Sequence, residues 1–192
     1  MSLKINIDGI PDLAVGFARS RNFLGGLIAL CRGGPGAIFN NNFPSHAFLF
    51  TSDAGSMFAT EEGSSGLVED SLDTYTSTSN QIVAIMYWTG WNDPVKKNKA
   101  LAHLAAVRAD GGPRAAYGYG ILPYFLPVIG PWFKPSTKTL NNGPEECAED
   151  VAGIHIVDGG ADFLPTKLLA PDQLLSIMAF STECVEIKPI YL

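Results

Sequence analysis

The stretch HAFLFTSDAGSMFATEEGSSGLVE, residues 46–69, predicts the centre of the fold. Its first run, HAFLFT, is strand-like, and the turn signal SDAGS follows it. The next run, MFAT (57–60), leads through EEGSSG to LVE, which is the pattern of a hairpin. We therefore expect short strands that pair with their neighbours along the chain in an antiparallel sheet.

Two further runs predict strands on either side of this stretch. GGLIALC (25–31) is short and apolar and is ended by RGGPG, which favours a buried strand followed by a turn. QIVAIMYW (81–88) predicts the clearest strand, because β-branched and aromatic residues fill it. The first half of the chain is therefore expected to be rich in strands.

The second half changes to helical patterns. A helix is expected over 92–112, where Asn92 or Asp93 caps it, Pro94 opens it and two glycines end it. A second helix is expected from Pro144 to about Ile156, ended by DGG. PDQLLSIMAF then predicts a short helix or turn, and CVEIKPIYL predicts a terminal strand.

Composition limits the possible functions. The 192 residues suit a single domain spanning 1–192, and the net charge of -6 would repel a phosphate backbone, so no nucleic-acid partner is expected. The most apolar segment, 121–133, holds three prolines and is shorter than the ~20 residues of a spanning helix. No signal-peptide pattern opens the chain, and the three cysteines form no CxxC pair. We expect a cytoplasmic protein with free thiols and no transmembrane segment.

Cys147, within NNGPEECAEDVAG (141–153), is the candidate nucleophile. With Pro144 opening the helix, it lies near the first turn, where free backbone N–H groups and the helix dipole favour a thiolate. At about 100° per residue, the four nearby carboxylates fall mainly on the opposite helical face, and Asp150 is the nearest exception. The alternative is that Cys147 is only a small buried side chain, as free cysteine often is.

The histidines differ in how well each is placed to act as a base. His155 lies on the same helix as Cys147 but roughly 12 Å along it, too far to take its proton. His103 falls among alanines in mid-helix, which favours a surface or interhelical role. His46 opens a strand directly after a Pro-Ser turn, so it is rigid and next to a loop. It is the candidate base, with a purely structural histidine as the alternative.

A carboxylate from the hairpin could orient His46. Glu61 and Glu62 both follow the strand expected at 57–60, and an antiparallel neighbour can bring a carboxylate beside a histidine on the same sheet face. The alternative is that they only form a polar turn. No metal site is expected, since no short ligand spacing links Cys31, His46, Cys147 and His155.

Taken in order, these segments resemble the permuted branch of the papain-like, NlpC-type cysteine hydrolases, the YiiX-like group. In that branch "sHvgi" precedes a "viEA...Gv" hairpin, and "yDf" precedes a "CSElva" helix. The corresponding segments here are SHAFLF, FATEEGSSGLVE, YGYG and CAEDVAG, within roughly residues 25 to 175. YGYG departs from Tyr-Asp-Phe, and Ala148 stands where serine is common.

The resemblance implies an α+β, circularly permuted papain-like domain, with an antiparallel sheet or barrel packed against helices. It also implies that Cys147 is the nucleophile, His46 the base and Glu61, rather than Glu62, the acid that orients His46. The implied activity is cleavage of a peptide or amide bond, without a cofactor.

Two other functions remain open. An acyltransferase or thioesterase of the lecithin retinol acyltransferase type is the first, because the aromatic segment 121–133 could hold an acyl chain. A non-catalytic binding protein with the same fold is the second. The substrate is therefore expected to be a peptide, an amide or an acyl compound, and the oligomeric state is left open. The candidate substrate contacts are Tyr117, Tyr119, Tyr124 and Trp132.

Overall fold

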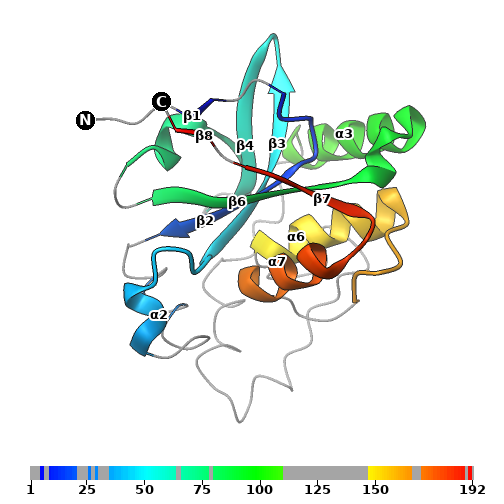
Figure 1. Cartoon of the computed structure of the whole chain (residues 1–192). Helices are drawn as coiled ribbons and strands as arrows, with labels where there is room; N and C mark the ends of the chain where they lie inside the picture. The colour runs from blue at the N-terminus through cyan, green and yellow to red at the C-terminus, as the bar shows by residue number, and fades with distance from the viewer. Residues whose placement is uncertain are drawn as a thin grey trace.

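A computed structural model describes residues 5–6, 9–20, 26, 29, 35–63, 66–77, 80–109, 147–165, 170–188 and 190–191. Within this part, six strands form an antiparallel sheet in the order β5-β4-β3-β2-β6-β7, and helices pack against it (Figure 1). The predicted α+β class with an antiparallel sheet is therefore confirmed. The strands of this sheet are β2 (Val15–Ser20), β3 (His46–Asp53), β4 (Ser56–Gly63), β5 (Gly66–Ser71), β6 (Asn80–Trp88) and β7 (Cys184–Ile187).

The quoted stretch forms the predicted meander. β3 and β4 are joined at Ala54 and Gly55, whose φ angles of 47° and 84° suit a tight two-residue hairpin turn. β4 is longer than expected, because it keeps pairing with β5 as far as Gly63 opposite Gly66. As a result Glu61 lies within a strand, with its backbone fixed by the sheet, and not in a turn.

Three expectations about strands were wrong or incomplete. Gly26 and Ala29 are helical, so a strand over 25–31 is wrong; a short apolar run does not by itself distinguish a strand from a buried helix. β2, the strand between β3 and β6, was not predicted. The expected terminal strand is divided into β7 and β8 (Ile190–Tyr191), and β8 pairs with β1 (Ile5–Asn6) in a separate two-stranded sheet.

The predicted helices are present with shifted ends. α3 (Pro94–Ala109) is capped by Asp93, whose Oδ1 accepts the Val95 N–H at 2.9 Å. α6 (Cys147–Ile154) continues as a π-helix, η4 (His155–Gly159), and stops at Gly160 with φ 72°, later than Ile156. The remaining helices are α2 (Pro35–Phe39), which replaces part of the expected RGGPG turn, α7 (Pro171–Phe180), and the 3-10 turns η1 (Leu72–Tyr75) and η2 (Thr89–Asn92).

The sheet separates two apolar clusters, and β3 contributes to both through its alternating side chains. Ala47 and Leu49 belong to the cluster that holds the buried side chains of α3, α6 and α7. Phe48 and Phe50 belong to the cluster on the other face, with Tyr75 of η1. We call these the helical face and the η1 face. Figure 1 shows α6 and α7 side by side against the sheet, which agrees with the contacts between them.

Candidate active site

His46 and Glu61 meet on the η1 face of the sheet. His46 Nε2 donates to Glu61 Oε2 in a close hydrogen bond, since an ionised carboxylate can only accept. The register explains the meeting: Leu49 pairs with Thr60, which places Glu61 opposite Phe48 and one same-face position from His46. The two side chains are only 14% and 10% exposed. The predicted pairing of His46 with a carboxylate from the hairpin is confirmed, and the carboxylate is Glu61.

Tyr75 completes this cluster, although the sequence gave it no role. Its hydroxyl donates to Glu61 Oε2, the same oxygen that accepts the His46 proton. Its ring is nearly parallel to that of His46, at an interplanar angle of 8°, and stacks on Phe48 at 4.5 Å between centroids. No local sequence pattern identifies Tyr75 as a partner of Glu61, because only the packing of η1 over the sheet brings the two residues together.

The surroundings of Glu61 favour its ionised form. Burial raises its pKa, but hydrogen bonds with His46, Tyr75 and Asp70 and the charge of His46 lower it, and the net pKa is below the usual value. Asp70 on β5 shows the opposite effect: its hydrogen bond to Glu61, together with burial, raises its pKa. The hydrogen bond between the two acids therefore favours the ionised form of Glu61 and the protonated form of Asp70.

Cys147 is the first described residue of α6, and its side chain lies outside the described part of the chain, as do residues 141–146. Ala148 and Val151, further along α6, are buried in the helical-face cluster with Ala47 and Leu49. The body of α6 therefore packs on the sheet face opposite the His46 ring. The side chains of Glu62 and Asp150 and the four aromatic substrate candidates, Tyr117, Tyr119, Tyr124 and Trp132, also lie outside the described residues.

The other two histidines have structural roles. His103 Nδ1 contacts Asp158 Oδ2 at 2.6 Å and joins α3 to η4, which confirms an interhelical role. His155 is fully buried; its Nδ1 donates to the Val151 carbonyl at 2.8 Å, and its Nε2 accepts from Trp91 Nε1 at 3.0 Å. Burial lowers the pKa of His155 to about 4, so this imidazole is neutral at physiological pH.

We expect His155 to make folding sensitive to acid. The unfolded state binds the proton below pH 6.5 while the folded state excludes it until about pH 4, so stability is lost as the pH falls through this window. Between pH 7 and 4 the unfolding free energy of the wild type should fall by about 3 kcal/mol more than that of His155→Gln. Urea titrations at each pH measure this difference, and parallel curves would contradict the prediction.

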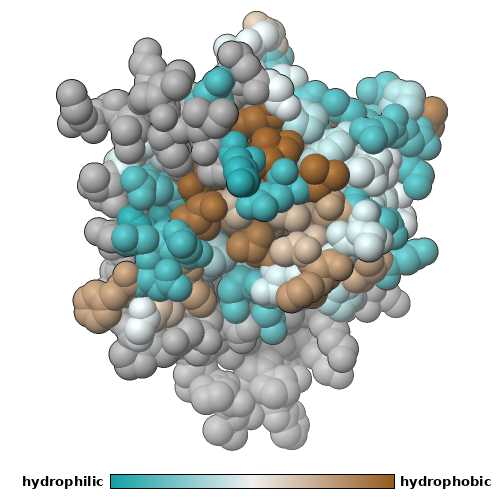
Figure 2. All heavy atoms as spheres, viewed as in Figure 1, coloured by the Kyte–Doolittle hydropathy of each residue, from teal (hydrophilic) through white to brown (hydrophobic). Residues whose placement is uncertain are grey.

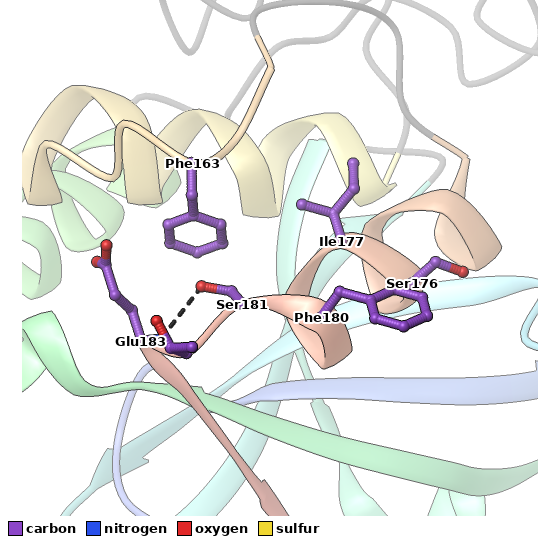
Figure 3. Close-up of a pocket in the computed structure, with 7 residues that line it drawn as sticks. Phe163, Ser176, Ile177, Phe180, Ser181 and Glu183 are labelled. Atoms are coloured by element: carbon purple, nitrogen blue, oxygen red, sulfur yellow. Dashed lines mark hydrogen bonds between the residues drawn. The ribbon is translucent and has the colours of Figure 1, made fainter.

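A second feature of the described surface is a hollow beyond the end of α7 (Figure 3). Its volume is about 530 Å³, and Figure 2 shows apolar side chains beside polar ones on this side of the molecule. Neither histidine nor cysteine is among its described lining residues, so those residues offer no thiol and base. They are Phe163, Ser176, Ile177, Phe180, Ser181, Thr182 and Glu183.

Two general features bear on the site. Among the described residues, no cluster of three or more His, Cys, Asp or Glu side chains is arranged to bind a metal ion. In the same part of the chain, no helix has the length and apolar character needed to cross a membrane.

Comparison of the sequence with known proteins finds no match. The chain matches no protein-family model, and no curated protein shows a significant match to it. The likeness to the permuted NlpC-type hydrolases therefore rests on the short motifs quoted above and stays a prediction.

Proposed function

We propose that the protein is a cysteine hydrolase in which Cys147 is the nucleophile, His46 the general base and Glu61 the residue that orients His46. The observation that supports this proposal most is the His46–Glu61 pair, a buried imidazole held by a carboxylate on adjacent strands. The expected place of Cys147 in the first turn of its helix, after Pro144, adds support, because a helix N-terminus stabilises a thiolate.

The direction of the His46–Glu61 hydrogen bond assigns the two ring nitrogens. Because Nε2 donates to Glu61, Nδ1 is the nitrogen that would accept the proton of the Cys147 thiol. The thiolate would then attack the acyl carbon of a peptide or amide, and a backbone N–H at the start of α6 would stabilise the oxyanion. His46 would return the proton to the leaving amine, and water would release the acyl group from Cys147.

This mechanism sets a geometric requirement. α6 packs on the helical face, whereas the His46 ring lies on the η1 face. His46 is the first residue of β3 and Cys147 the first described residue of α6, so the pair must form near these two positions. A thiol held beneath the middle of the sheet would not meet this requirement.

The His46–Glu61 pair also fits a second candidate function, that of a non-catalytic binding protein. In that case His46, Glu61 and Tyr75 would be a hydrogen-bonded network that stabilises the η1 face, and Cys147 an ordinary buried residue. An acyltransferase or thioesterase of the lecithin retinol acyltransferase type has no described residue in its favour, since the aromatic segment 121–133 lies outside the described part.

Alkylation of the three cysteines separates the two candidates. At pH 7 we expect iodoacetamide to modify Cys147 at least tenfold faster than Cys31 or Cys184, because only a thiolate reacts. Burial raises the pKa of Cys184 to about 11, so Cys184 should react slowly under either candidate, and Cys31 is the deciding reference. Mass spectrometry of the native protein measures the three rates. A rate at Cys147 no higher than at Cys31 would contradict the hydrolase and leave the binding protein.

A further inference from the structure

Tyr75 contacts both His46 and Glu61, yet the proposed reaction has not used it. Its hydroxyl and His46 Nε2 donate to the same oxygen, Glu61 Oε2. Its ring lies 6.3 Å from that of His46, almost parallel to it, and Phe48 packs against both rings. The residue is 4% exposed, so this arrangement is formed away from bulk solvent.

The backbone of η1 fixes the position of Tyr75. Ser71 caps the turn by accepting the Asp73 N–H at 3.2 Å, and Thr76 Oγ1 donates to the Asp73 carbonyl at 2.7 Å. Leu72, at the start of the turn, is buried in the η1-face cluster. Both ends of the turn are thus held, and the Tyr75 hydroxyl reaches Glu61 from a rigid segment.

We propose that Tyr75 is a positioning residue that acts on His46 through Glu61. By donating to Glu61 Oε2, it fixes the carboxylate against the imidazole and takes up part of the negative charge that would otherwise act on the His46 proton. Its role in turnover rests on the hydrolase proposed above. Its effect on His46 does not.

The charged and titratable groups that face Glu61 each come from a different element. Among the described residues, they are His46 from β3, Asp70 from β5 and Tyr75 from η1. A carboxylate whose charge is shared among several donors attracts each proton less strongly. Removing the Tyr75 hydroxyl leaves more of the Glu61 charge to His46, so the imidazolium should become more stable and the pKa of His46 should rise.

The test is an NMR titration of the His46 ring in the full chain. In Tyr75→Phe, the pKa of His46 should rise by about half a unit or more, a threefold change in proton affinity. Tyr87→Phe is the matched control, because Tyr87 donates to Asn92 at 3.0 Å, and it should leave the pKa of His46 unchanged. A His46 pKa that stays the same or falls in Tyr75→Phe would overturn the proposal.

A double-mutant cycle shows whether the effect passes through Glu61. In a Glu61→Gln background, the added Tyr75→Phe change should produce no further shift of the His46 pKa, because the charge it acts on is gone. An equal shift in both backgrounds would overturn the proposed route, and would mean that Tyr75 acts on His46 by packing alone. Circular dichroism of each variant confirms that the fold is kept.

The outcomes separate this inference from the proposed function. The His46 titration needs no thiol and can be repeated in Cys147→Ala. If Cys147 reacts no faster than Cys31 but Tyr75→Phe shifts the His46 pKa, the hydrolase fails and the positioning role remains. If Cys147 reacts selectively and His46 does not respond to Tyr75→Phe, the hydrolase stands and the role of Tyr75 is refuted.

Discussion

Replacing His46 with alanine should slow the alkylation of Cys147 at pH 7 by about twentyfold. The reason is that only the thiolate reacts, and the His46 imidazole, held by a carboxylate on the adjacent strand, is the group expected to keep Cys147 ionised. Without His46 the pKa of Cys147 should return to about 8.5, so only a few per cent of the thiol is ionised at pH 7. Iodoacetamide rates measured at Cys147 in the wild type and the variant give the ratio directly, without a known substrate.

Three matched variants make this result specific. Glu61→Gln should slow Cys147 about tenfold, since it removes the charge that orients His46, whereas Glu62→Gln should have no effect. His103→Ala should also leave the rate unchanged, because His103 pairs with Asp158 between α3 and η4. A wild-type rate in His46→Ala, or an equal loss in His103→Ala, would contradict the assigned base.

Truncating Phe48 should cause one of the largest losses of stability in the described core. The ring is fully buried, stacks on Tyr75 and packs over Gly16, where an added Cβ would lie 2.3 Å from the ring. Gly16 has no side chain that could fill the space left by the Phe48 ring, so Phe48→Ala should lower the unfolding free energy by about 3–5 kcal/mol.

Phe180→Ala is the control for this prediction. Phe180 ends α7 and is 91% exposed, so its truncation should change the unfolding free energy by less than about 0.5 kcal/mol. Urea denaturation at pH 7 measures both variants against the wild type. A loss under about 1 kcal/mol in Phe48→Ala would mean that the η1 face repacks, and would contradict the rigid cluster around His46.

The features that sequence predicts well here are the local ones. β3, β4 and β5 follow one another with short turns, so each strand pairs with its neighbour along the chain. Asp93 and Pro94 mark the start of α3 by side-chain and ring chemistry that needs no distant partner. The contact between His46 and Glu61 was predictable for the same reason, as both lie on adjacent strands of one meander.

The features that were missed depend on distant parts of the chain. β2 lies between β3 and β6, and its run VGFARS is buried nearly throughout, so no alternation marks it as a strand. Tyr75 reaches Glu61 only after η1 folds over the sheet. Val151 and Ile154 of α6 are buried in the helical-face cluster, but helical periodicity alone does not tell which face of the sheet they meet.

The pH dependence of Cys147 alkylation tests the central claim most directly, because it reports the thiolate and its base together. The account predicts that the rate follows an apparent pKa below about 7, and that this pKa moves to about 8.5, the ordinary cysteine value, in His46→Ala. A wild-type profile already centred near about 8.5 and unchanged in His46→Ala would show that Cys147 and His46 are not a catalytic pair.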